Sequence, residues 1–126
     1  MKKNKFYIST PAYYPSAHLH LGHTYCTVLC DALARYNRLI GKEVYYLTGS
    51  DEHGMKIEKN AEKAGLSPKQ FVDGIAKTFE DLWKKLDIQY DRMIRTTDED
   101  HLHAVEEIFS RFLKQLIQQL IHDFLL

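Results

Sequence analysis

The feature that most constrains the fold is the alternation of β-prone runs with segments of helical periodicity. β-Branched and aromatic residues are concentrated in two short runs, at residues 6–10 and 43–48, and a third short strand could lie at 91–95. Apolar residues three and four positions apart predict helices over 22–40, 55–64, 68–86 and from about 98 onward. Such alternation favours right-handed crossovers and a parallel sheet flanked by helices. We therefore expect one continuous α/β unit over residues 1–126.

Proline, glycine and serine mark the ends of the predicted elements. Pro11 is expected to end the first strand, because proline lacks the N–H that a sheet interior requires. Gly41 stops the first helix, and Ser67-Pro68 gives the third helix an N-cap followed by proline at its first position. The last helix is predicted to face inward with an apolar stripe of Leu102, Val105, Ile108, Phe109, Phe112, Leu113, Leu116 and Ile117.

Composition narrows the classes of protein that this chain can represent. With 17 basic and 17 acidic residues, the formal net charge of zero provides no general attraction for nucleic acid. The basic N-terminus leads into a strand-like run instead of the apolar segment of a signal peptide, and no stretch has the length of a membrane span. Cys26 and Cys30 lack the partners of a structural zinc site and are expected to be small buried side chains. These features favour a cytoplasmic protein without a metal site.

A first polar cluster follows the first predicted strand and runs to the start of the next helix. His20 and His23 are three residues apart, so they share one side of the first helical turn. The free N–H groups of a helix N-terminus attract phosphate, and Gly22 leaves room for close approach. Two imidazoles at this position could donate hydrogen bonds to phosphate oxygens. Residue spacing leaves an equal alternative, in which both histidines are merely solvated.

A second polar cluster, residues 48–54, follows the second predicted strand. Ligands of open parallel sheets bind beyond the carboxyl ends of the strands, so neighbouring strands would bring both clusters to one pocket. Asp51 could hold an ammonium group by a charge-assisted hydrogen bond, and His53 could orient it or contact the same ligand. Glycine, serine and aspartate also form ordinary solvated turns, which is the simpler interpretation of this segment taken alone.

The two clusters together resemble a known family. His20-Leu21-Gly22-His23 is similar to the HIGH motif of class I aminoacyl-tRNA synthetases. The segments 10–15, Thr-Pro-Ala-Tyr-Tyr-Pro, and 47–54, Leu-Thr-Gly-Ser-Asp-Glu-His-Gly, resemble the methionyl-tRNA synthetases in particular. The likeness covers about residues 5 to 115. Leucyl, isoleucyl and valyl enzymes share the HIGH motif but differ in the context of the Gly-x-Asp-x-His-Gly loop.

The resemblance implies a Rossmann-like, HUP-type fold and an ATP-dependent ligase. The family's reaction is attack of the methionine carboxylate on the α-phosphate of ATP, which is bound with Mg²⁺, followed by transfer of the methionyl group to tRNA. Carried over by position, the ATP-binding and catalytic residues are His20, Gly22 and His23, with the two histidines stabilising the transition state. The implied methionine-binding residues are Pro11, Ala12, Tyr14, Asp51 and His53, with Asp51 and the Ala12 carbonyl on the ammonium group.

The last residues depart from the family pattern. Residues 116–126 continue an apolar helical stripe where the family leaves the helix through a glycine turn. The KMSKS lysine loop, the connective insertion that often carries zinc cysteines and the anticodon-binding domain do not occur in this sequence. We therefore expect an incomplete first half of the fold, inactive in methionine activation by itself and prone to self-association through its last helix. The alternative is a non-catalytic binding or interaction module derived from a synthetase.

Overall fold

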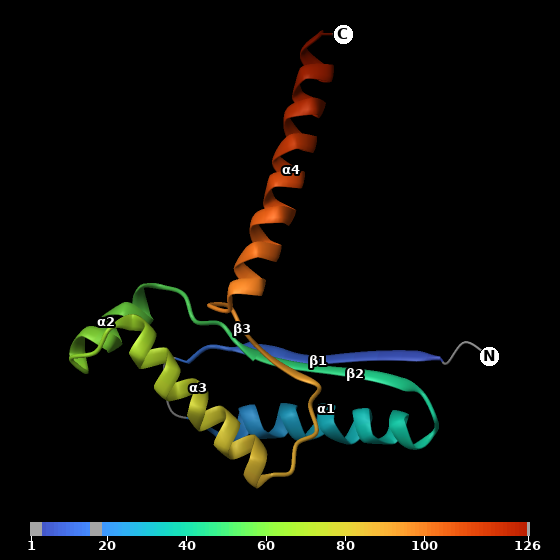
Figure 1. Ribbon diagram of the computed structural model, residues 1–126, viewed down its shortest axis with the longest axis vertical. Helices are drawn as coiled ribbons and strands as arrows, with labels where there is room; N and C mark the ends of the chain where they lie inside the picture. Colours follow the sequence, from blue (N-terminus) through green and yellow to red (C-terminus); the bar gives the residue numbers. More distant parts are fainter. Residues whose placement is uncertain (1–3, 16–18, 126) are drawn as a thin grey trace. The chain divides into compact units, whose positions relative to one another are not determined.

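The computed structural model describes residues 4–15 and 19–125, with side chains up to residue 119. The chain forms two compact units, residues 1–96 and 97–126. The first unit contains β1 (Lys5–Tyr13), α1 (Leu21–Leu39), β2 (Glu43–Ser50), α2 (Met55–Lys63), α3 (Pro68–Lys85) and β3 (Arg92–Arg95). The second unit contains α4 (Glu99–Leu125). Figure 1 shows this order of elements in colour along the chain.

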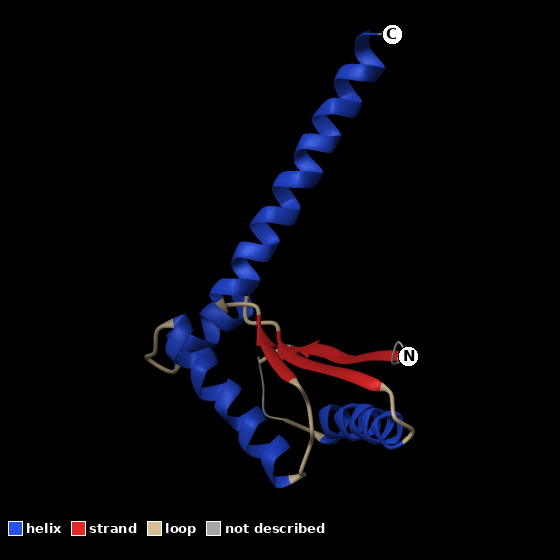
Figure 2. Cartoon of the chain, turned by 45° about the vertical axis from the view of Figure 1, so that its right-hand side comes forward, coloured by secondary structure: helices blue, strands red, loops and turns tan. Residues whose placement is uncertain are grey.

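The first unit is a parallel sheet with helices packed on it, as predicted. The strand order is β1-β2-β3, and both neighbouring pairs are parallel. Helices α1 and α3 lie on the same face of this sheet (Figures 1 and 2). On the described part of the other face, the rings of Tyr7 and Tyr45 stack with centroids 6.2 Å apart and remain exposed. The α/β fold class is thus confirmed, with α1 and α3 on one face of the sheet.

The prediction that Pro11 ends the first strand is wrong, because β1 continues through Pro11 to Tyr13. Ser9 pairs with Leu47 and Ala12 with Gly49, so two residues of β1 stand opposite one residue of β2. This bulge removes Pro11 from the regular ladder, where its missing N–H would leave a hydrogen bond unmade. Since β1 is also an edge strand of the described sheet, its other side makes no ladder that proline could interrupt.

Gly49 is required by the close approach of β2 and β3. A Cβ atom at this position would lie 2.8 Å from the Cγ2 atom of Ile94 and closer still to the Ile94 carbonyl oxygen, which is backbone and cannot turn away. We expect Gly49→Ala to lower the free energy of unfolding by about 1–3 kcal/mol, the usual cost of overpacking. Urea unfolding followed by circular dichroism would measure it.

Gly74 provides the matched control for this prediction. It lies within α3, and an added Cβ would meet no atom within 4 Å. Gly74→Ala should therefore raise the free energy of unfolding by about 0.5–1 kcal/mol, because alanine loses less conformational freedom in a helix. Equal effects of the two substitutions would contradict the steric explanation for Gly49.

Helix α1 buries its less apolar face. The residues of α1 that pack toward the sheet are small or polar, namely Thr27, Cys30, Asp31, Ala34 and Asn37. The larger apolar residues that define its periodicity are exposed, including Tyr25, Leu29, Leu33 and Tyr36. Small side chains allow α1 to approach the strands closely, and Asp31 is satisfied by Arg35 and by the Gln89 N–H. Hydrophobic spacing thus located the helix but not its buried face.

Two apolar clusters form the core of the first unit. One contains Tyr13, Phe79 and Trp83, and the other contains Cys30, Ala34 and Tyr46. Ile88 and Tyr90 pack against both clusters, so the segment before β3 joins α3 to α1. The expectation that the cysteines are buried holds for Cys30, while Cys26 is half-buried, and both thiols are free.

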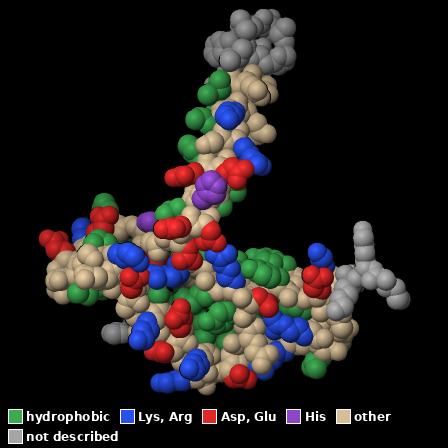
Figure 3. Space-filling model, in the orientation of Figure 1, with side chains coloured by type: hydrophobic (Ala, Val, Ile, Leu, Met, Phe, Trp, Pro, Cys, Tyr) green, Lys and Arg blue, Asp and Glu red, His purple; other side chains and the backbone are tan. Residues whose placement is uncertain are grey.

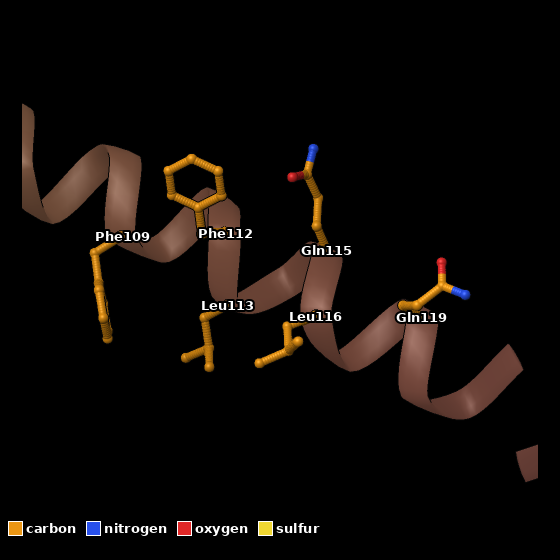
Figure 4. Close-up of a pocket in the computed structure, with 6 residues that line it drawn as sticks. All are labelled: Phe109, Phe112, Leu113, Gln115, Leu116 and Gln119. Carbon is orange, nitrogen blue, oxygen red and sulfur yellow. The ribbon is translucent and has the colours of Figure 1, made fainter. Parts of the chain in front are cut away.

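The prediction that the stripe of the last helix faces inward is wrong for the described residues. The apolar side chains from Leu102 to Ile117 are exposed, with Phe109 and Phe112 at 67% and 65%. Figure 3 shows apolar side chains along α4, and in the close-up of Figure 4 Phe109, Leu113 and Leu116 point to the same side. A single helix has no second layer within its own unit against which to bury such a stripe.

Candidate functional site

The carboxyl ends of β1 and β2 lie side by side, as predicted from the topology. Ala12 pairs with Gly49 and Tyr13 with Ser50. The ladder extends one step further, because the Asp51 N–H donates to the Tyr13 carbonyl at 2.9 Å. The first cluster therefore meets the second through Ala12 and Tyr13, which stand beside residues 49–51. This is the edge at which open parallel sheets bind ligands.

His20 and His23 form a reciprocal capping box at the start of α1. The Nδ1 atom of His20 accepts a hydrogen bond from the Gly22 N–H at 3.1 Å, and Nδ1 of His23 accepts one from the His20 N–H at 3.2 Å. Their rings lie 4.0 Å apart between centroids. A Cβ atom on Gly22 would lie 2.9 Å from the Cε1 atom of the His20 ring, so glycine makes this arrangement possible.

The capping bonds determine which ring nitrogens carry hydrogen. A neutral imidazole has one donor and one acceptor nitrogen, and in both histidines Nδ1 is the acceptor. Nε2 of His20 and of His23 therefore carries the hydrogen and can donate it to another group. Each histidine thus uses one ring nitrogen at the start of the helix and retains one donor.

Burial and the nearby His20 ring lower the pKa of His23 from its usual value. His23 therefore binds a proton more readily in the unfolded chain than in the folded one. The free energy of unfolding is unaffected by His23 above about pH 6.5 and decreases as the pH falls from there toward the folded-state pKa. We expect an NMR titration to place the His23 pKa below about 6.5. His23→Gln should remove this part of the pH dependence of unfolding, and a His23 midpoint above that value would contradict the assignment.

Tyr13 links the two clusters, although the sequence did not single it out. Its carbonyl accepts the Asp51 N–H, and its hydroxyl donates to the His23 carbonyl at 3.2 Å and lies 2.8 Å from Oγ1 of Thr27. Burial raises the pKa of Tyr13 to about 12, so the hydroxyl keeps its proton. Predicting that β1 ends at Pro11 placed Tyr13 in a loop, and the bulge breaks the two-residue alternation of β1, so Thr10 and Tyr13 are buried three positions apart.

The loop after β2 uses its two carboxylates differently. The Glu52 side chain is fully buried. Its carboxylate accepts hydrogen bonds from Nε and Nη2 of Arg95, at 2.6 and 2.9 Å, and from the Ser50 hydroxyl at 2.6 Å. Asp51 is half-buried, and its carboxylate has no hydrogen-bond or ion-pair partner within the described part of the chain. The loop thus neutralises one negative charge and leaves the adjacent one available to a cationic group.

The remaining predicted residues lie around the same strand ends with different contacts. Pro11, within the bulge, and Ala12, directly after it, are exposed residues of β1. Tyr14 is half-buried and reaches Gly54, where an added Cβ would come within 2.9 Å of its hydroxyl. His53 turns to β3, with Nε2 3.2 Å from the Thr96 carbonyl oxygen. Within residues 4–15 and 19–119, no group of three or more His, Cys, Asp or Glu could hold a metal ion.

Comparison with known sequences assigns the chain to one family. The model of the family "tRNA synthetases class I (M)" matches residues 6–121. The methionine–tRNA ligase of Halalkalibacterium halodurans is 59% identical over 114 residues, and that of Enterococcus faecalis is 55% identical over 114 residues. Each alignment covers 90% of this chain and 17% of the relative. The chain therefore spans about a sixth of the length of these curated relatives.

Solved structures agree with the sequence comparison. The Mycobacterium tuberculosis methionyl-tRNA synthetase in complex with methionyl-adenylate matches with a TM-score of 0.83 and 39% identity, covering 86% of this chain and 21% of that one. A LeuRS from Agrobacterium radiobacter, solved with tRNA, matches with a TM-score of 0.81 but only 26% identity, covering 91% and 15%. The fold is thus common to both enzymes, while sequence identity favours the methionyl one. By family match and identity, this chain belongs to the class I tRNA synthetases of the methionyl type.

Proposed function

We propose that this chain carries part of a methionine-activating site, which binds methionine and ATP for the formation of methionyl adenylate. The observation that best supports the proposal is the linkage through Tyr13, which joins the histidine pair of α1 to the loop that presents Asp51. One cluster offers hydrogen-bond donors and the other an unpaired carboxylate, which match a phosphate and an ammonium group. Methionine–tRNA ligase relatives at 55–59% identity favour methionine over other amino acids.

In this proposal, an oxygen of the methionine carboxylate attacks the α-phosphorus of ATP, and the bond to the departing pyrophosphate breaks. His20 and His23 donate their Nε2 hydrogens to phosphate oxygens, where negative charge grows in the transition state. The N-terminus of α1 adds its N–H groups and positive dipole end. The acceleration comes from positioning and electrostatics, without a covalent bond to the protein.

The methionine end of the proposed site involves residues of both strand ends. Asp51 holds the ammonium group by a charge-assisted hydrogen bond, with the Ala12 carbonyl as a second acceptor. Tyr14 and Pro11 line the amino-acid pocket, where an aromatic ring suits a thioether. His53 lies beside this pocket, held by the Thr96 carbonyl.

The further partners are proposals about the whole enzyme. Mg²⁺ would enter with the phosphates of ATP, tRNA would receive the methionyl group, and zinc would belong to the family's connective insertion. A cytoplasmic location suits a tRNA-charging enzyme. None of the described helices combines the length and apolar character needed to cross a membrane.

Self-association through α4 stays a prediction. Its exposed stripe around Phe109, Leu113 and Leu116 would be removed from water by pairing with another copy. Sedimentation velocity should detect an oligomer whose dissociation is promoted by Phe109→Ser. A well-folded monomer at all protein concentrations would contradict the prediction.

Methionine-dependent ATP–pyrophosphate exchange tests the proposed function. Exchange above background by the 126-residue chain, abolished by His23→Ala, would support an activation site assembled by these residues. Folded protein that shows no exchange but binds methionine would favour the alternative of a non-catalytic binding module. Folded protein that neither exchanges nor binds methionine would contradict the proposal for this chain.

A further inference from the structure

Arg95 connects three segments of the first unit. It is the last residue of β3, and its guanidinium lies between the carboxylates of Glu52, in the loop after β2, and Asp73, on α3. The distances are 2.6 and 2.9 Å to Glu52 and 2.7 Å to Asp73. The Arg95 side chain is 21% exposed and that of Glu52 is fully buried. The two-bond contact with Glu52 fixes direction as well as distance.

Thr96, the residue after Arg95, makes further contacts with the loop of residues 50–53. The Thr96 hydroxyl accepts the Glu52 N–H at 2.8 Å, the Thr96 N–H donates to the Ser50 carbonyl at 3.1 Å, and the Thr96 carbonyl lies 3.2 Å from Nε2 of His53. The residues on both sides of Asp51 are thus held by the end of β3. The Asp51 backbone is held by Tyr13, while its carboxylate remains without a partner among the described residues.

We propose that Arg95 is a positioning residue, which through Glu52 fixes the loop of residues 50–53 and aims the Asp51 carboxylate at the ammonium group of the substrate. The functional half of this inference rests on the proposed function. The physical reason is that a buried carboxylate beside Asp51 must be neutralised by a charge of fixed geometry. Arginine provides a planar fork that lysine cannot reproduce.

Arg95 also determines how much negative charge the loop of residues 50–53 presents to the substrate. The hydrogen bonds to Glu52 and Asp73 raise the pKa of Arg95 above its usual value, so it stays protonated throughout the working pH range. With Glu52 compensated, Asp51 provides the uncompensated negative charge of this loop. Loss of Arg95 would leave two adjacent carboxylates competing for one cation and would favour movement of Glu52 toward water.

The test compares three variants of the 126-residue chain by amide hydrogen exchange and by calorimetric titration with methionine and with ATP. Arg95→Lys keeps the charge but loses the fork, and Glu52→Gln keeps the shape but loses the charge. Lys69→Gln is the matched control, since Lys69 bonds both oxygens of the same Asp73 carboxylate, at 3.1 and 3.0 Å, and belongs to α3 and not to the loop. Near-ultraviolet circular dichroism verifies that each variant is folded.

We expect Arg95→Lys and Glu52→Gln to lower the protection of the Asp51 and Glu52 amides by about tenfold or more, while the Ile88 amide, bonded to Trp83, is unchanged. Methionine affinity should fall by about tenfold and ATP affinity should not, since only one ligand uses Asp51. Lys69→Gln should change neither quantity.

The outcomes separate this inference from the proposed function. Unchanged protection of residues 51 and 52 in both loop variants, or an equal loss across the whole sheet, would overturn the positioning role. Loss of local protection with methionine affinity unchanged would overturn the link to the substrate. If the unaltered chain binds no methionine, the proposed function fails for this chain, while the exchange data still decide whether Arg95 holds the loop.

Discussion

Trp83→Ala is expected to destabilise the first unit by about 3–5 kcal/mol, the usual range for removing a large aromatic side chain from a core. Trp83 is fully buried and packs against Tyr13 and Phe79, with ring centroids 6.0 and 6.2 Å away. Since the free energy of unfolding of a folded domain is only about 5–15 kcal/mol, this substitution would remove a large part of the stability of the unit. Thermal and urea unfolding, monitored by circular dichroism, would measure it.

Trp83→Phe and Lys85→Ala are the comparison variants. The indole N–H of Trp83 is buried with no acceptor among the described residues, so phenylalanine removes an unsatisfied donor along with part of the ring. We expect a smaller loss, about 1–2 kcal/mol, for Trp83→Phe. Lys85→Ala, on the exposed side of the same helix, should stay within about 0.5 kcal/mol. A loss for Trp83→Ala no larger than that of Lys85→Ala would show that this cluster does not hold the unit together.

The second large effect concerns ligand binding. Asp51→Ala is expected to weaken methionine binding by about 2–4 kcal/mol, the scale for losing a charge-assisted pair in a closed site. The carboxylate is half-buried beside the end of β1 and has no competing partner among the described residues. Calorimetric titration with methionine measures the change directly. Replacement should leave the fold intact, because the attachment of the loop depends on the Asp51 backbone and on Glu52.

Two controls make the Asp51 result interpretable. Asp81→Ala makes the same change of charge at an exposed position on α3 and should leave methionine affinity unchanged. Methioninol, which keeps the ammonium group but lacks the carboxylate, should lose affinity in the Asp51 variant to the same degree as methionine. An Asp51→Ala protein that binds methionine normally would remove Asp51 from the proposed site.

Local sequence signals determined the elements and their order. Helical periodicity, the Ser67 capping box with Gln70, and glycines with positive φ at 41 and 65 fixed where helices begin and end. These signals act within a few residues, so they can be recognised without knowledge of the fold. The alternation of strands and helices then implied a parallel sheet, which placed both polar clusters at one edge. The motifs at residues 10–15, 20–23 and 47–54 together were sufficient to indicate the family.

Tertiary structure decided which side chains of these elements are buried or paired. The pair of Glu52 with Arg95 joins residues 43 positions apart, so it depends on the register of β2 against β3. Tyr13 became the link between the clusters only because β1 passes through Pro11 at a bulge. Which face of α1 is buried depends on how closely that helix approaches the strands. The hydrophobicity of its side chains does not predict this distance. Contacts between segments distant in sequence arise from register and packing distance, and these exist only once the chain has folded.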